Sequence, residues 1–167
     1  MKVEVDQSGK IEDTSKLTVL AFSNDKTGAI ILSAKDKRRL QEKFREVGAP
    51  RLFVDYVFSS LLILLLKSLK STKVVVDLEY PGHTEIIESL VKLKVDVDIE
   101  WRSIGKSSKA HDIAYKVYCG KLKIGKRVKA EQIWRLSKKI TGGYLKTGLS
   151  PANRYSAPVN KKMLAKK

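Results

Sequence analysis

Four acidic side chains of types that bind divalent cations stand at the ends of predicted elements: Asp6, Asp77, Glu79 and Asp112. Clustered carboxylates repel one another, so they persist where a cation compensates their charge. Two Mg²⁺ or Mn²⁺ ions held by such groups can activate a water and stabilise the leaving oxygen of a phosphodiester. Taken singly, each acid is better explained as a solvated strand end or an ion pair with a lysine than as a functional group. If they converge, they predict a catalytic metal site.

Whether they converge depends on the elements that carry them. Apolar alternation and short apolar runs predict strands at residues 2–6, 17–23, 29–33, 73–80 and 95–101. Helical spacing predicts helices at residues 35–47, 51–69, 84–93 and 109–118. We therefore expect an α/β fold with a mixed five-stranded sheet, in which a three-stranded antiparallel meander is joined by two further strands and flanked by helices.

The fourth predicted strand follows a helical crossover, so it should lie parallel to the first strand or at an edge. If it lies beside the first strand, a crevice opens at the carboxyl ends of the two strands, where α/β proteins place their sites. Asp6 would then lie beside the acidic end of the fourth strand. Alternation along a strand points Asp77 and Glu79 to the same side.

Three sequence features together resemble the ribonuclease H-like superfamily, which includes ribonucleases H, RuvC-type Holliday-junction resolvases and transposases. They are the Asp-x-Ser-Gly of residues 6–9, the acidic end of the fourth strand, and the Ala-His-Asp-x-Ala of residues 110–114, in this order of elements. The resemblance covers about residues 1–120. It implies that the first and fourth strands are adjacent, that Asp6 is the shared ligand of two Mg²⁺ or Mn²⁺ ions, and that Asp112 is the ligand from the last helix.

Two branches of the superfamily imply different further ligands. Enzymes of the ribonuclease H type add an acid from the first long helix and an Asp from the fourth strand, for which Asp55 and Asp77 are available. Resolvases of the RuvC type use a strand Glu, here Glu79, and a polar ligand one turn before the final Asp. That position is Lys109, which cannot bind a metal while charged, and the neighbouring His111 is expected to point elsewhere on the helix. Both branches remain open.

The resemblance implies a metal-dependent nuclease that acts on structured nucleic acid, and a homodimer if the chain is a resolvase. Inactive members of the superfamily bind nucleic acid without cleaving it. A non-catalytic nucleic-acid-binding module is therefore the alternative.

The basic residues are concentrated towards the carboxyl end of the chain. The chain has 167 residues, with 34 Lys and Arg against 18 Asp and Glu and a net charge of +16, and Glu131 is the one acid after residue 120. We therefore predict a domain at 1–120 and a basic extension at 121–167, with a helix at 130–140 and then a flexible tail. A basic extension favours the phosphate backbone of DNA, RNA or a hybrid as partner. The candidate contacts are Lys106, Lys109, Lys126, Arg127, Lys138, Lys139, Lys161 and Lys162.

Other site classes and a membrane location are disfavoured. One Cys and two His exclude a disulfide framework and a Cys/His zinc site. The most apolar run, residues 52–66, is short for a membrane span of about 20 residues and contains Asp55. The first ten residues are charged and lack an apolar run, so we expect no signal peptide and a cytoplasmic location.

Overall fold

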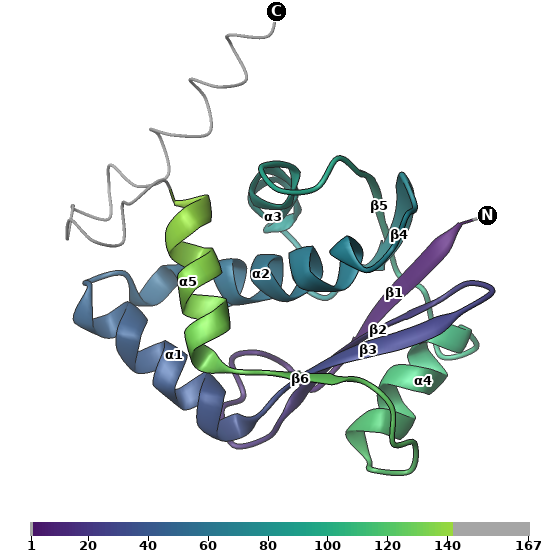
Figure 1. Cartoon of the computed structure of the whole chain (residues 1–167), viewed down its shortest axis with the longest axis horizontal. Coiled ribbons are helices and arrows are strands. Elements are labelled where there is room, and N and C mark those ends of the chain that lie inside the picture. The colour runs from purple at the N-terminus through teal and green to yellow at the C-terminus, as the bar shows by residue number, and fades with distance from the viewer. Residues whose placement is uncertain (1, 142–167) are drawn as a thin grey trace, which may run out of the picture.

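The computed structural model describes residues 2–141, which form a six-stranded mixed sheet with helices on both faces (Figure 1). The strands are β1 (Val3–Ser8), β2 (Thr18–Ser23), β3 (Thr27–Leu32), β4 (Lys73–Asp77), β5 (Asp98–Arg102) and β6 (Lys126–Val128). The helices are α1 (Ala34–Glu46), α2 (Phe53–Lys67), α3 (Thr84–Lys92), α4 (Lys109–Tyr118) and α5 (Ala130–Ile140), with a 3-10 turn η1 (Pro50–Leu52) before α2.

The strands lie side by side in the order β5-β4-β1-β2-β3-β6. β2 is antiparallel to β1 and β3, which confirms the predicted meander. β4 pairs with β1 in parallel, with Val5 opposite Val76, and β5 pairs with β4 in parallel. The expectation that β4 lies beside β1 is therefore confirmed, and the carboxyl ends of these strands meet at one edge.

The prediction of five strands is wrong, because β6 adds a sixth. Its three residues pair in parallel with β3, with Arg127 opposite Ile31. The chain then enters α5, which begins at Ala130. The backbone N–H of Ala130 donates to Oδ1 of Asp36, near the start of α1, at 3.0 Å. The start of the predicted basic extension is thus part of the sheet and of the helical layer. The predicted flexible tail lies outside the described residues.

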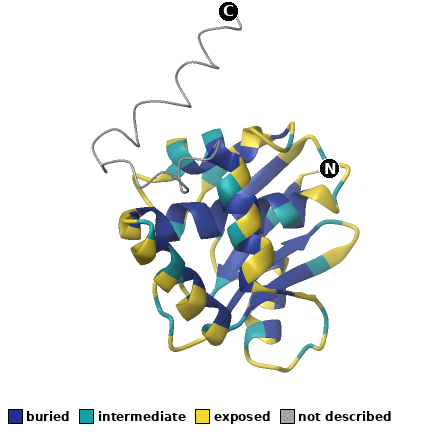
Figure 2. Cartoon of the chain, turned by 60° about the vertical axis from the view of Figure 1, so that its left-hand side comes forward, coloured by how far each residue is buried: buried dark blue, intermediate teal, exposed yellow. Residues whose placement is uncertain are grey.

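Alternation along the strands gives the sheet two apolar faces. Val3 and Val5 of β1 pack into a large cluster with α1, α2, α3 and α5, whereas Val19 and Ala21 of β2 pack against α4. α2 is buried on most sides, which explains its long apolar run. Figure 2 shows the buried positions concentrated at the centre of the molecule. Within residues 2–141, no helix is long and apolar enough to cross a bilayer.

A lysine with no exposed surface fixes the segment between β1 and β2. Lys37, in the first turn of α1, is 0% exposed, and its Nζ donates to Lys10 O at 2.8 Å, Asp13 O at 2.6 Å and Thr18 Oγ1 at 3.0 Å. Burial disfavours the charged ammonium and lowers the pKa of Lys37 to about 8. One side chain thus holds residues 10–18 against α1.

Removing a side chain from α5 tests whether this helix belongs to the core. Ile133 is 0% exposed. We expect Ile133→Ala to lower the free energy of unfolding by about 2–5 kcal/mol, because it leaves a cavity in the core. Glu131→Ala, which removes only an exposed ion pair with Arg39, should change it by less than about 1 kcal/mol. Equal effects of the two changes in urea denaturation would contradict a structural role for α5.

Lys37→Met should destabilise the protein by about 1–3 kcal/mol, because three buried acceptors lose their donor. The difference in the free energy of unfolding between the wild type and Lys37→Met should also depend on pH. Between the folded pKa of about 8 and the ordinary value of 10.5, the unfolded chain binds more protons at this site than the folded chain. The wild type therefore gains stability from this group as the pH rises through that window, and the variant does not. Urea denaturation at pH 7 to 10 measures both effects, with exposed Lys35→Met as the control; parallel pH curves would contradict the account.

Candidate functional site at the carboxyl ends of β1 and β4

Two aspartates lie side by side where β1 and β4 approach their shared edge. Val5 and Val76 are partners, so the residues that follow them, Asp6 and Asp77, are neighbours on the same face of the sheet. Asp6 is only 4% exposed, and its Oδ1 accepts a hydrogen bond from Gln7 N at 2.7 Å. Burial raises the pKa of Asp6, and the negative charge of Asp77 raises it further, against the opposing hydrogen bonds from Gln7 and His111. Asp6 is therefore a carboxylate held at an energetic cost.

His111 of α4 supplies the third side chain. Its Nδ1 lies 2.7 Å from Asp6 Oδ2, and about a third of its side chain is exposed. Because an ionised carboxylate can only accept, His111 Nδ1–H is the donor to Asp6 Oδ2 when that carboxylate is charged. The start of α4 is fixed by Ser108, whose Oγ accepts from Ala110 N and donates to Glu4 Oε2 at 2.7 Å. A cap residue thus anchors His111 beside β1.

The structure does not bring Asp112 to Asp6. Asp112 is half-exposed, and its Oδ2 accepts from Lys116 Nζ at 2.7 Å, one turn along α4. Each residue turns an α-helix by about 100°. The residues of α4 that pack on the sheet are Ala110, Ile113, Ala114 and Val117, so Asp112 falls on the far side. His111, expected to point elsewhere, is the residue of this helix that reaches Asp6.

Glu79 approaches the pair from a loop and not from a strand. β4 ends at Asp77, so the predicted strand 73–80 is too long and the alternation argument does not apply to Glu79. Burial is the main cause that raises the pKa of Glu79, and the negative charge of Asp77 is the second. The charges of Asp6 and Glu12 raise it further, whereas the positive charge of Lys10 lowers it. Asp77 Oδ1 accepts from Ile104 N at 2.8 Å. The acids are therefore close enough to repel one another.

Asp55 belongs to a different pair, on the face of the sheet that α2 covers. It is 1% exposed, and its Oδ1 lies 2.7 Å from Nδ1 of His83, at the start of α3. Burial raises the pKa of Asp55, and the hydrogen bond with His83 opposes this shift. α4, the helix that carries His111, lies on the other face (Figure 1). Asp55 therefore does not join Asp6, and sequence spacing gave no sign of its pairing with His83.

The donor types at this edge fit a hard divalent cation, because carboxylate oxygens are the ligands that Mg²⁺ and Mn²⁺ prefer. Their arrangement does not form a ready coordination shell. Within residues 2–141, no three His, Cys, Asp or Glu side chains are grouped so as to hold a metal ion. The site thus has suitable ligand chemistry without an assembled metal centre.

The candidate phosphate contacts are spread over several elements. Lys106 and Lys109 are exposed at the start of α4, near His111 in sequence, and Lys126 and Arg127 are exposed on β6. In α5, Lys139 is exposed and Lys138 is half-buried. Lys161 and Lys162 lie outside the described residues.

The repulsion between the acids is directly measurable. We expect Asp77→Asn to lower the pKa of Asp6, because it removes a negative charge that raises it. A carboxyl ¹³C NMR titration measures this shift. Asp112→Asn, on the outer side of α4, is the matched control and should leave the Asp6 titration in place. A shift in the control as large as that in Asp77→Asn would mean that the neighbouring carboxylate is not the cause.

The structure thus gathers Asp6, Asp77, Glu79 and His111 at one edge, from β1, β4, the loop after β4 and α4. It places Asp55 and Asp112 elsewhere. Comparisons of the chain with protein-family models, with curated proteins and with solved structures found no match.

Proposed function

We propose that the chain is a metal-dependent nuclease with an RNase H-like fold, hydrolysing phosphodiester bonds in structured nucleic acid. The observation that carries the proposal is the buried Asp6 carboxylate, which lies beside Asp77 of the parallel neighbouring strand and is hydrogen-bonded to His111 of α4. The adjacency of β1 and β4 and the meander of β1 to β3 support the fold assignment.

Asp6, Asp77 and Glu79 are the residues that would hold Mg²⁺ or Mn²⁺. A bound divalent ion supplies charge to activate a water and to stabilise the oxygens of the phosphate. Because burial, and then neighbouring negative charges, raise the pKa of Asp6 and of Glu79, protons compete with a cation for these groups as the pH falls. His111 fixes the orientation of the Asp6 carboxylate through Nδ1.

The charge of the chain supports nucleic acid as the substrate. A net charge of +16 attracts polyanions, and exposed Lys106 and Lys109 lie just before His111 in the sequence. Binding through phosphate contacts releases counterions, so affinity should fall steeply with salt. The substrate that is cut best, whether DNA, RNA, hybrid or junction, would distinguish the ribonuclease H branch from the resolvase branch. A homodimer is expected only for the resolvase branch.

The second candidate is a nucleic-acid-binding module without catalysis. Two observations favour it: within the described residues no three potential ligands are grouped, and Asp112 is paired with Lys116 on the outer side of α4. In this case the acids at the edge of the sheet would have only structural roles.

A cleavage assay with a panel of substrates separates these functions. We expect Mg²⁺- or Mn²⁺-dependent cutting of at least one of duplex DNA, duplex RNA, RNA–DNA hybrid and a four-way junction. Asp6→Asn should abolish the cutting. His111→Ala should lower the rate about 10- to 100-fold, because it removes the group that orients a metal ligand. Asp112→Asn changes the neighbouring residue of the same helix and serves as the control, so it should leave the cleavage rate unchanged.

Two readouts decide the outcome. Mn²⁺ binding, followed by electron paramagnetic resonance, should be weaker in Asp6→Asn than in the wild type. Salt-sensitive binding of every substrate without cutting, and without Mn²⁺ binding, would exclude the nuclease and favour the non-catalytic module.

A further inference from the structure

A lysine-rimmed hollow lies at the opposite end of β1 and β4 from the acids. Its volume is about 730 Å³, and it is lined by the start of β1, the turn between β2 and β3, and the segment that leads from α2 into β4. Asp6 follows Lys2 by four positions along the chain, which corresponds to roughly 13 Å of extended strand. The hollow is therefore a site distinct from the acidic edge.

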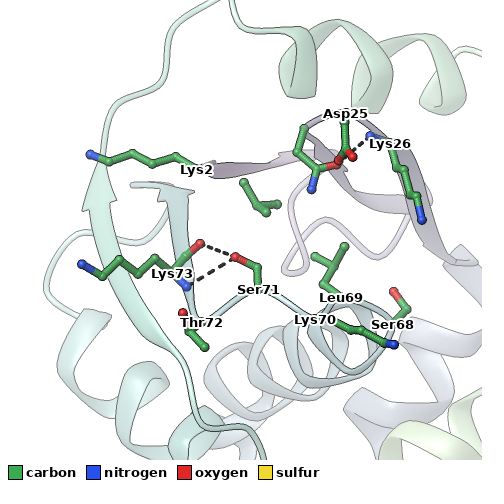
Figure 3. Close-up of a pocket in the computed structure, with 11 residues that line it drawn as sticks. Lys2, Asp25, Lys26, Ser68, Leu69, Lys70, Ser71, Thr72 and Lys73 are labelled. Carbon is green, nitrogen blue, oxygen red and sulfur yellow. Dashed lines mark hydrogen bonds between the residues drawn. The ribbon is translucent and has the colours of Figure 1, made fainter.

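The charges around this hollow are mostly positive. Lys2, Lys26, Lys70 and Lys73 line it, and Asp25 is the one acid among its lining residues. Figure 3 shows Lys2 and Lys73 extending on one side of the hollow and Lys26 and Lys70 on the other, with Leu69 between them. The hollow thus has lysines on two opposite sides.

Three of these lysines have no partner among the described residues. Lys2 Nζ is 3.1 Å from Glu100 Oε2. The ammonium groups of Lys26, Lys70 and Lys73 make no hydrogen bond or ion pair to any side chain or carbonyl of residues 2–141. They are exposed and free to meet a ligand.

The backbone around the hollow already has internal partners. Ser68 Oγ donates to Leu65 O at 2.6 Å and closes the end of α2. Ser71 Oγ donates to Lys73 O at 2.8 Å and accepts from Lys73 N, as the dashed lines in Figure 3 show. The carbonyls at the negative end of α2 are thus in part satisfied, and the lysines are the groups left to bind an anion.

We propose that this hollow binds a nucleic-acid strand at a point remote from the acidic edge. Lysine binds phosphate as a flexible point charge, and lysines on two sides suit phosphates that flank a nucleotide. Leu69, which is partly exposed, supplies an apolar surface for the base or sugar between those phosphates. The volume is that of a small-ligand site, which is enough for one or two nucleotides. The inference rests on the proposed function only in the class of ligand, since it requires no cleavage.

The test measures binding of a fluorescent single-stranded oligonucleotide to the full chain by anisotropy, without divalent metal, over a series of salt concentrations. The variant is Lys26→Gln/Lys70→Gln/Lys73→Gln. The control, Lys16→Gln/Lys35→Gln/Lys94→Gln, removes the same charge from exposed lysines that lie outside the hollow and outside residues 121–167. Each lost single-strand phosphate contact should reduce the slope of log K against log salt by about 0.7. The hollow variant should therefore lose about 2 from the slope and bind up to about 100-fold more weakly near 0.1 M salt.

The control should lose much less, and equal losses in the two variants would overturn the inference. A second measurement does not depend on variants: amide NMR signals of residues 69–73 in the wild type should shift when the oligonucleotide is added, and unshifted signals there would also overturn it. If the hollow binds a free nucleotide such as AMP but not the oligonucleotide, the proposal of a nucleic-acid strand is wrong and the ligand is a free nucleotide.

Failure of the inference and failure of the proposed function give different results. If the wild type cleaves nucleic acid but the hollow variant binds as the control does, only the inference fails. If binding depends on the hollow and no substrate is cut, the inference stands and the nuclease fails.

Discussion

The parallel pairing of β1 with β4 is the contact on which the other features depend. A parallel pair requires a crossover, and here α1, η1 and α2 form it and cover one face of the sheet. Both strands are covered on two faces, which is why Val74, Val75 and Val76 form a continuous buried run. Because both strands run in the same direction, like ends meet: Asp6 lies beside Asp77 at one edge, and Lys2 and Lys73 lie at the other.

This arrangement separates charge along the strands. Acids of like sign lie together at the carboxyl ends, and lysines of like sign lie together around the amino ends. Side chains of like charge on neighbouring strands oppose pairing, so the apolar packing between the two ends has to offset this repulsion. At the acidic edge, part of the compensation is internal, since Gln7 N–H and His111 both stabilise the Asp6 carboxylate. The network around Lys37 solves the opposite problem, a buried cation, by giving the ammonium three oxygen acceptors.

The sequence predicted the long elements well, because each has an apolar period that matches its structure, and α4 and α5 begin and end where expected. β6 was missed because three residues carry no period, and only pairing with β3 makes them a strand. The choice of Asp112 over His111 was avoidable: the apolar stripe at Ala110, Ile113, Ala114 and Val117 already places Asp112 opposite the core. Lys37 likewise stands on the stripe of Leu40 and Phe44. By contrast, the pairing of Asp55 with His83 joins residues from two elements whose approach depends on tertiary packing.

The two outer strands determine how this sheet meets other chains. β5 forms one border and exposes Asp98, Glu100 and Arg102, so an added strand would have to bring its own side chains against this row of charges. β6 forms the other border and offers only three residues, with Lys126 and Arg127 exposed. Short, charged borders are the usual protection against edge-to-edge aggregation. A second copy of the chain would therefore gain little by continuing the sheet at either border.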